Sequence, residues 1–449
     1  MGFDQRLPPT RREALKLGAG LLGGAVGGGM LAGGSSAAAA EQSPIGTWPA
    51  GVAGSTAFIG ITVPRTGTYA VQGEDLLKGY QLAIEHLNAG DELMRRVAPK
   101  VTTGLLGKQV TFGVADSEAK PNTAVQAQSR FISQNKAILM TGSCSSAVAV
   151  ALNKLGQREK VIYLPGVSGS NDTTGKDCTR YSFRTCFYGQ TAAAALSPVL
   201  LQALGKNKKV AYLTPDYTYG HTVQQSMQEY LKKGGWTTAT NQVAPLGTSD
   251  FSSYLLNIGN SGADILVNIE WGNDGVESVK QASQFGLLKK QTLVVAYQVP
   301  MLAKEVGPEL TQGVFSATDF WWTLQDQYPL AKLFVAAFEK KFGYKPDWSA
   351  QAGYMQISLW ARMVSEAGTF YPPQLIKTYE QGQHMDSLVG DVWFRPEDHQ
   401  LVRPVFIVRG KKPSEMKSPD DYWDMVETVP GKGIMQAPGA FGCKLGAYT

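Results

Sequence analysis

The sequence predicts an α/β protein built as two doubly wound parallel-sheet lobes joined by three hinge crossings. Alternation of apolar runs and amphipathic segments begins at Ala57, restarts near Tyr188, and gives way to long helices after Trp322. Such alternation is typical of parallel sheets with helices on both faces, and the restart indicates a second sheet. The chain is expected to cross back near His399, so that the two lobes can hinge about the crossing segments.

The elements of the first expected lobe follow from residue periodicity. The segment 73–88 carries Leu76, Tyr80 and Leu87 on one helical face, and Asn122 is placed to cap the next helix. The expected strands are 57–63, 110–115, 137–140 and 161–164, and the expected helices are 73–88, 122–134 and 145–155.

The second expected lobe repeats the pattern. Its strands are expected at 209–214, 265–269, 292–296 and 313–317, and its helices at 191–204, 221–233, 254–260 and 275–285. Two further helices, 330–342 and 350–367, have no strands of their own and are expected to return to the first lobe. Strands at 392–394 and 403–408 are expected to be joined by a turn.

The first forty residues predict a twin-arginine signal peptide. Thr10-Arg11-Arg12 precedes an apolar, glycine-rich stretch at 17–31 and a small-residue tail at 37–40. The stretch is short for a membrane span, and an uncleaved anchor is the alternative. The expected protein is therefore exported and periplasmic. Its expected parts are a signal peptide (1–40), a linker (41–55), an N-terminal lobe (56–187 and 320–398), a C-terminal lobe (188–319 and 399–430) and a tail (431–449).

Composition excludes several function classes for this 449-residue chain. The net charge is only +5 and no basic cluster stands out, which argues against nucleic acid as a partner. The G-x-G-x-x-G pattern at 18–23 lacks the preceding strand and following acid of a dinucleotide site, so no cofactor is expected. Four scattered histidines predict no metal site.

The four cysteines lack the C-x-x-C spacing of a zinc or thioredoxin-like site. In an oxidising compartment, Cys178 and Cys186 are candidates for a disulfide that closes a small loop. For Cys144 and Cys443, both pairing and burial as free thiols remain open.

Two hydroxyl-rich turns each follow an apolar run, about one strand–helix unit apart. They read T-G-S-C-S-S at 141–146 and P-G-V-S-G-S at 165–170. In an open α/β sheet such turns lie side by side at the carboxyl ends of neighbouring strands, where ligands bind. Hydroxyls and free N–H groups at a helix N-terminus suit a small anion such as a carboxylate. The pattern therefore favours holding a small molecule over transforming it.

Seven ordered motifs between residues 57 and 410 carry a family resemblance. They are T-G-T-Y-A-V-Q-G, G-S-C-S-S, L-P-G-V-S-G-S, Y-S-F-R-T, Y-T-Y-G, S-D-F-S-S and V-W-F-R-P-E-D-H-Q. The chain resembles the type I periplasmic solute-binding proteins, in the leucine/isoleucine/valine-binding group that serves ABC transporters. The resemblance implies a monomer that captures a small ligand between two lobes and presents it to a membrane permease.

The resemblance places a ligand carboxylate on the first lobe. It implies contacts from the side chains of Ser145 and Ser168 and from backbone groups of Ser143, Cys144 and Gly166. Helix capping is the alternative role of the two serines, although capping and anion binding use the same N–H groups.

Other motif positions complete the expected site. Tyr219 and Trp271 are expected to close over the ligand from the second lobe, with packing in the core as their alternative role. Gln72 matches a contact of the first lobe, and Tyr188 lies where the family has an acid. Gln298 replaces the glutamate that holds the ligand ammonium in branched-chain amino acid receptors.

An amide carries no charge, so the substitution at position 298 removes a charge-assisted contact. Glu270 is a substitute carboxylate, unless strand alternation points it away. Arg65 and Trp321 are two further ligand-contact candidates, with a solvated arginine and a core tryptophan as alternatives. Together these features favour a carboxylate-bearing ligand without the usual amino group, such as an aromatic or other organic acid.

Two other function classes remain open at the level of sequence. A ligand-sensing or accessory protein of an exported redox system would use the same fold. An exported hydrolase would need Cys144 or Ser145 as nucleophile, with His221 as the one candidate base near the motifs. The absence of a G-x-S-x-G elbow makes the hydrolase the weakest of the three.

Overall fold

The computed structural model describes residues 54–297 and 301–448. The predicted signal peptide and Gln298 lie outside the described residues. Among the helices that are described, each is too short or too polar to span a bilayer.

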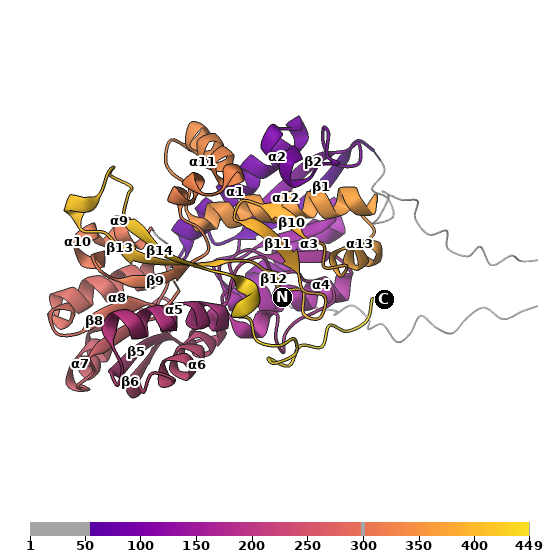
Figure 1. Ribbon diagram of the computed structural model, residues 1–449. Helices are drawn as coiled ribbons and strands as arrows, with labels where there is room; N and C mark the ends of the chain where they lie inside the picture. The colour runs from indigo at the N-terminus through magenta and orange to yellow at the C-terminus, as the bar shows by residue number, and fades with distance from the viewer. Residues whose placement is uncertain (1–53, 298–300, 449) are drawn as a thin grey trace, which may run out of the picture. The chain divides into compact units, whose positions relative to one another are not determined.

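The first sheet has four parallel strands in the order β2-β1-β3-β4. The strands are β1 (Thr56–Val63), β2 (Gln109–Asp116), β3 (Leu139–Gly142) and β4 (Ile162–Pro165). The helices of this lobe are α1 (Ala70–Ala89), α2 (Glu92–Val97), α3 (Pro121–Asn135) and α4 (Ser146–Glu159). Crossover helices between parallel strands are what the apolar periodicity requires (Figure 1).

The second sheet has seven strands in the order β14-β13-β9-β8-β7-β5-β6. The strands are β5 (Lys209–Pro215), β6 (Thr237–Ala244), β7 (Ile265–Asn268), β8 (Thr292–Val295), β9 (Phe315–Thr318), β13 (Val405–Gly410) and β14 (Trp423–Val429). Strands β5 to β9 are mutually parallel, and β13 runs antiparallel to both β9 and β14. The helices of the second lobe are α5 (Gly189–Leu204), α6 (Thr218–Lys232), α7 (Ser252–Asn260), α8 (Asn273–Gln284), α9 (Leu302–Val306) and α10 (Pro308–Thr311).

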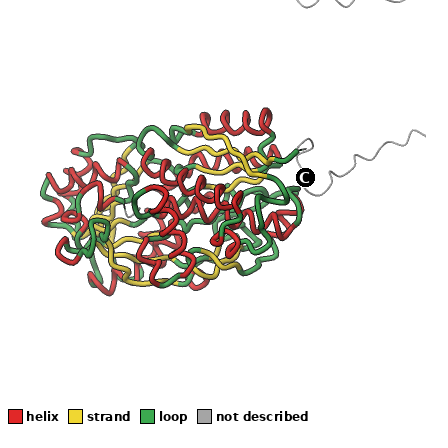
Figure 2. The backbone as a smooth tube through the Cα atoms, turned by 90° about the horizontal axis from the view of Figure 1, so that it is seen from above, coloured by secondary structure: helices red, strands yellow, loops and turns green. Residues whose placement is uncertain are grey.

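The predicted class, two parallel-sheet lobes covered by helices, is confirmed. In Figure 2 the strands run between layers of helix, as expected for sheets buried on both faces.

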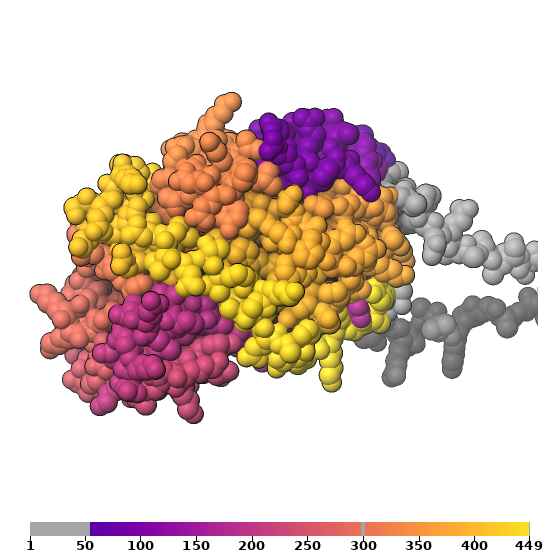
Figure 3. Space-filling model, in the orientation of Figure 1, coloured from indigo at the N-terminus to yellow at the C-terminus, as the bar shows by residue number. Residues whose placement is uncertain are grey.

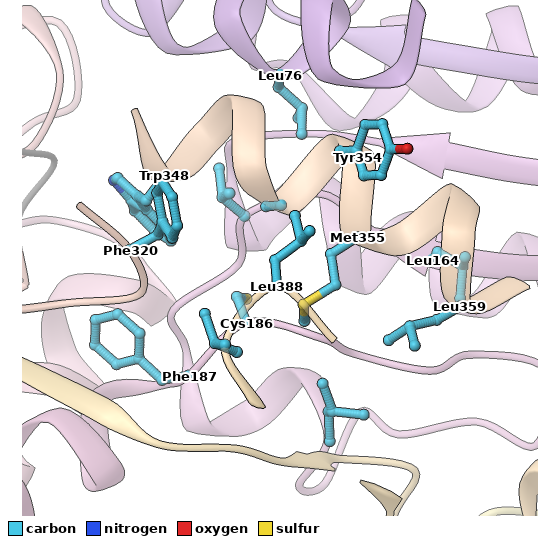
Figure 4. Close-up of a cluster of buried hydrophobic side chains, with 14 of the residues drawn as sticks. Leu76, Leu164, Cys186, Phe187, Phe320, Trp348, Tyr354, Met355, Leu359 and Leu388 are labelled. Atoms are coloured by element: carbon cyan, nitrogen blue, oxygen red, sulfur yellow. The ribbon is translucent and has the colours of Figure 1, made fainter. Parts of the chain in front are cut away.

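Two helices that follow the second sheet return to the first lobe, as the sequence predicts. They are α11 (Pro329–Phe342) and α12 (Trp348–Ala367), and a short helix, α13 (Pro372–Tyr379), follows them. Helix α12 packs along α1, and their side chains share one buried cluster. Figure 4 shows Leu76 of α1 above Tyr354, Met355 and Leu359 of α12.

Three crossing segments join the lobes, and one ion pair links all of them. Phe187 in the first crossing donates its backbone N–H to Asp319 Oδ1 in the second, at 3.1 Å. Arg403 in the third crossing lies 3.1 Å from the same oxygen, and its guanidinium also donates to the Asp319 carbonyl. Both charged side chains are buried. Desolvation raises the pKa of Asp319 to about 6, and the neighbouring Arg403 opposes that rise.

The structure corrects two local predictions. Strands 392–394 and 403–408 do not form one hairpin. Instead, β11 (Gly390–Phe394) pairs with β10 (Met385–Ser387) and β12 (Leu401–Val402), whereas β13 joins the second sheet. Asn122 is not a cap, because Lys120 takes the N-cap position and Pro121 begins α3.

The C-terminal tail runs from the second lobe to the first. Beyond β14, the Ile434 carbonyl accepts a hydrogen bond from Gln190 of α5, at 2.7 Å. Farther along, the Ala447 carbonyl accepts one from Gln157 of α4, at 3.1 Å. In Figure 3 this segment, in yellow, lies across the surface between the two lobes.

Candidate functional site

The turn after β3 positions Ser145 at the start of α4. Ser143 has a positive φ of 84°, and its hydroxyl donates to the Ser145 carbonyl at 2.8 Å. The same hydroxyl accepts from the Ser145 N–H at 3.1 Å. These two bonds fix the turn and leave Ser145 as the N-cap residue in an extended conformation.

The turn after β4 lies directly beside the first. Ser146 Oγ joins the two, because it contacts Ser168 Oγ and the Ser170 N–H, each at 3.1 Å. Gly166 donates its N–H to Gly142, and a Cβ at Gly166 would lie only 2.4 Å from the Ser143 carbonyl oxygen. Neighbouring parallel strands therefore bring the two hydroxyl-rich turns together.

The two predicted serines differ in what their hydroxyls do. Ser168 Oγ is bonded within its own turn, to Thr173 Oγ1 at 2.7 Å as well as to Ser146. Ser145 Oγ is buried, makes no capping bond to α4, and has no hydrogen-bond partner in the described part of the chain. Gln72 Oε1, on α1, is also buried without a partner there. An unpaired buried hydroxyl is costly, which makes Ser145 a stronger candidate for a ligand contact than Ser168.

Six aromatic side chains from both lobes form a closed circuit, in which each ring lies beside the next. The circuit runs Tyr69, Trp271, Trp348, Tyr297, Tyr219, Tyr217 and back to Tyr69. The successive ring-centroid separations are 4.8, 6.2, 5.5, 5.6 and 5.7 Å, and a 2.8 Å hydrogen bond between the Tyr217 and Tyr69 hydroxyls closes it.

The aromatic circuit spans the two lobes. Tyr69 caps α1 and Trp348 begins α12, both in the first lobe, and the other four rings come from the second. Three members have a buried polar atom without a partner among the residues described: Tyr219 Oη, Trp271 Nε1 and Trp348 Nε1. Gly169, in the second hydroxyl turn, places the circuit beside the serines. A Cβ there would meet the Tyr297 ring at 2.9 Å and the Tyr219 ring at 3.0 Å.

Glu270 lies beside the aromatic circuit, on the side of Tyr217 and Tyr219. It follows β7 by two residues, where strand alternation no longer fixes its direction, and it is only 1% exposed. Both of its carboxyl oxygens lack a hydrogen-bond partner in the ranges described. Burial, with a smaller contribution from Asp274, raises its pKa to about 9. Its charge in turn raises the pKa of Tyr217 and of Tyr219, which places it against that side of the circuit.

Three of the predicted site residues have partners outside the aromatic circuit. Tyr188 caps α5 and stacks on the Arg184 guanidinium, 4.6 Å from the ring centroid. Trp321 packs with Trp322 and Tyr422 in the core of the second lobe. Arg65 is half exposed and pairs with Glu74 at 3.5 Å.

The expected disulfide between Cys178 and Cys186 is wrong. Cys178 is bonded to Cys443 of the C-terminal tail instead. The chain runs extended between Tyr181 and Cys186, since it bridges β4 at Ser182 and passes Gln400 at Arg184, which carries position 186 away from position 178.

Cys144 and Cys186 are buried free thiols. Desolvation raises the pKa of both, to about 11 for Cys186, so they remain protonated and are poor nucleophiles. His221, the candidate base, is partly exposed and contacts Asp216 at 3.0 Å. In residues 54–297 and 301–448, no group of three His, Cys, Asp or Glu side chains is arranged to hold a metal ion.

Comparison with known proteins gives the family. Residues 56–415 match the model of the periplasmic binding protein family. The chain belongs to this family. A "Leu/Ile/Val-binding protein homolog 8" of Brucella suis biovar 1 (strain 1330) is 24% identical over 343 residues, which cover 72% of this chain and 81% of that protein. The resemblance drawn from the motifs is thereby confirmed.

Solved structures of periplasmic binding proteins share the fold. The amino acid ABC transporter substrate-binding protein from Pseudomonas fluorescens Pf-5 superposes with a TM-score of 0.78 at 22% identity, covering 88% of this chain and 100% of that one. An ABC transporter solute-binding protein from R. palustris, solved in complex with benzoate, gives 0.73 at 20% identity, covering 87% and 100%. At these identities the likeness establishes the fold.

The aromatic circuit was only partly visible in the sequence. Tyr69 and Tyr217 stand inside the quoted motifs T-G-T-Y-A-V-Q-G and Y-T-Y-G, but no local signal separates them from their neighbours. Trp348 begins a helix that is remote in sequence from every motif. Its place in the circuit depends on the return of α12 to the first lobe.

Proposed function

We propose that this periplasmic binding protein is the receptor of an ABC importer, and that it captures a small carboxylate-bearing ligand between its two lobes. The observation that carries the proposal is the buried, unpartnered Ser145 hydroxyl at the N-terminus of α4. A helix N-terminus favours an anion, and a hydroxyl there adds a directed donor. The lobes are proposed to divide at the boundaries expected from the sequence.

The aromatic circuit supplies the second lobe's part. Trp271 contacts Tyr69 and Trp348 across the lobes, and Tyr297 contacts Trp348, so these rings come together only when the lobes are closed. In the proposed cycle, Ser145 and nearby N–H groups seat the anion, and Tyr219, Trp271 and Gln298 close over the rest of the ligand. Binding shifts the balance of open and closed forms by its differential affinity for the closed form.

Two further parts of the proposal concern the cell. A twin-arginine signal at residues 1–40 would export the folded chain to the periplasm, where the closed monomer delivers its ligand to a membrane permease. The raised thiol pKa values of Cys144 and Cys186 favour this reading over an exported hydrolase.

Calorimetric titration of the Ser145→Ala variant tests the proposal. Loss of a hydrogen bond to a charged group costs about 1.5–3 kcal/mol, so we expect the dissociation constant for the tightest ligand of an amino acid and organic acid panel to rise at least about tenfold. Stability should change little, because the hydroxyl has no partner in the described structure.

Ser197→Ala is the matched control. Ser197 is as buried as Ser145 and its hydroxyl also lacks a partner in the parts described, but it lies within α5, away from the two hydroxyl turns. Unchanged affinity in Ser145→Ala, or an equal loss in both variants, would contradict the proposal.

A further inference from the structure

A cavity lies where the third crossing passes between the lobes. Its volume is about 320 Å³, at the lower end of the range for sites that hold small molecules. The first lobe lines it with Tyr328, just before α11, and with Trp393 of β11. The crossing contributes Arg403, and the turn after β14 contributes Lys432. Both lobes and one crossing therefore share this cavity, which we name the hinge pocket.

The lining of the hinge pocket is apolar where it is most buried and charged at its rim. Val389 and Val402 are at most 4% exposed. Tyr328 and Trp393 are half-buried, and Lys432 is exposed. This gradation suits a small ligand that has a flat apolar body and one polar end.

Packing holds the two aromatic rings of the hinge pocket in place. The Tyr328 ring lies 6.2 Å from that of Phe406 in β13, and a Cβ at Gly390 would lie only 3.0 Å from it. His384 stacks on Trp393 with a ring-centroid separation of 4.3 Å. Since these rings are already ordered, a ligand that contacts them loses little affinity to ordering of side chains.

The charges around the hinge pocket favour an anion. Arg403 Nε is buried without a hydrogen-bond partner in the described part of the chain, although the same guanidinium is paired with Asp319. Lys432 forms no ion pair with any residue described. The acid in the lining, Asp391, lies 2.6 Å from His384. A buried donor without a partner is costly, and an anion that reaches it would remove that cost.

We propose that the hinge pocket binds a small aromatic anion, with its ring against Tyr328 and Trp393 and its negative group at Lys432 and Arg403 Nε. The site is distinct from the cleft of the proposed function. None of its lining residues belongs to the two hydroxyl turns or to the aromatic circuit.

Occupancy of the hinge pocket is coupled to the cleft. Trp393 belongs to the first lobe and Lys432 follows the second sheet, so opening of the hinge would separate the walls that hold the anion. The anion thus favours the conformation in which the aromatic circuit closes, and it raises the affinity of the cleft for its own ligand. By linkage, the cleft ligand raises the affinity of the hinge pocket by the same factor. This coupling rests on the proposed function.

Fluorine NMR of the fluorotryptophan-labelled protein tests the site directly. The probes are 1-naphthoate and its neutral analogue 1-naphthamide. Trp393→Phe assigns the resonance of the hinge pocket, and the Trp271 resonance reports binding in the cleft. We expect 1-naphthoate to shift the Trp393 resonance with a dissociation constant of about 1 mM or below. The amide should bind at least tenfold more weakly.

Lys432→Glu tests the anion contact. Reversal of the charge repels the probe, so we expect the dissociation constant measured at Trp393 to rise at least about fivefold. Lys444→Glu is the matched control, because Lys444 is an exposed lysine of the same C-terminal tail that does not line the pocket. The two lysines are exposed, so both variants should fold like the wild type.

Calorimetric titration of the cleft tests the coupling. With 1-naphthoate near saturation of the hinge pocket, the tightest ligand of the amino acid and organic acid panel should bind the wild type at least about fivefold more tightly than it binds Lys432→Glu. Without the probe, the two proteins should bind it alike. Competition of 1-naphthoate for the cleft would weaken both proteins equally and cancels in this comparison.

The outcomes separate the hinge pocket from the proposed function. A Trp393 resonance that 1-naphthoate does not shift, or equal affinities in Lys432→Glu and Lys444→Glu, would overturn the site. Equal affinities of the cleft in the wild type and Lys432→Glu with the probe present would overturn the coupling. If no compound of the panel binds the cleft, the proposed function fails, and the titration at Trp393 still decides the site.

Discussion

At the scale of single residues, protonation of one buried carboxyl links stability to pH. The pKa of Glu270 rises from 4.5 to about 9 on folding because the group is desolvated. The folded protein therefore binds this proton more tightly than the unfolded chain does. The stability that the protonated group gives is fully present below the unfolded pKa, and it is lost as the pH rises towards 9.

Glu270→Gln should flatten this pH dependence. An amide keeps the shape of the carboxyl but does not ionise, and each unit of pKa shift corresponds to about 1.4 kcal/mol. We expect the free energy of unfolding of the wild type to fall by several kcal/mol more than that of the variant between about pH 4.5 and 9. Urea denaturation at a series of pH values measures the difference.

Other buried acids do not affect the difference in pH dependence between the wild type and Glu270→Gln. Asp75, Asp319 and Asp347 also have raised pKa values, but they titrate in both proteins and cancel in the difference. Parallel profiles for the wild type and Glu270→Gln would show that the Glu270 carboxyl is not desolvated in solution.

Sequence and structure contribute differently to the individual site residues. Ser145 was predicted as a ligand contact from the family resemblance of the motif G-S-C-S-S, and its place at the start of a helix could be expected from the sequence. Glu270 was considered, but its direction was open because it lies beyond the end of β7, where neither strand nor helix geometry applies. Only the packing around it decided that it faces the aromatic circuit.

At the scale of elements, the contact of α1 with α12 depends on two glycines. A Cβ at Gly79 would lie 2.0 Å from the carbonyl oxygen of Ala350, and one at Gly353 would lie 2.5 Å from that of Leu76. Both obstacles are backbone atoms, so they cannot move aside as a flexible side chain would. The close approach of these helices holds Trp348 in the first lobe, where Trp348 and Tyr69 both contact Trp271.

Gly79→Ala should therefore destabilise the protein. Overpacking of a close contact costs about 1–3 kcal/mol, and here the two helices would have to separate. Gly259→Ala is the control, because Gly259 lies on the exposed side of α7 with no atom within 4 Å of a new Cβ. That change should stabilise by roughly 0.5–1 kcal/mol. Chemical denaturation measures both, and equal effects would contradict the packing argument.

At the scale of the whole described unit, the C-terminal tail adds a covalent link across the lobes. It leaves β14 in the second lobe and is bonded through Cys443 to Cys178 in the first. The final residues hold the same place without the disulfide: Gly446 accepts from the Arg180 side chain at 3.0 Å, and Tyr448 bonds to Glu380. The tail thus links the two lobes in addition to the three crossings.

Cys443→Ser should lower the stability of the protein. Cys178 and Cys443 are 265 residues apart in sequence, and a native disulfide contributes about 2–4 kcal/mol to the free energy of unfolding. We expect a lower melting temperature for the variant, and the same value for the wild type after reduction. A reducing agent should leave the variant unchanged, because Cys144 and Cys186 are buried free thiols. A wild type that melts alike with and without the reductant would show that the bond does not form.

The sequence alone determined the local and repetitive features of this periplasmic binding protein. Apolar periodicity fixes helices and buried strands, and their alternation fixes parallel sheets, because few other arrangements bury every apolar face. Short motifs then located the two hydroxyl turns. The tertiary structure decided whatever depends on contacts between distant segments: the partner of Cys178, the contact of Trp348 with Trp271, and the unpaired burial of Glu270. Such contacts leave no local pattern, since the free energy that selects them comes from packing and desolvation in the assembled fold.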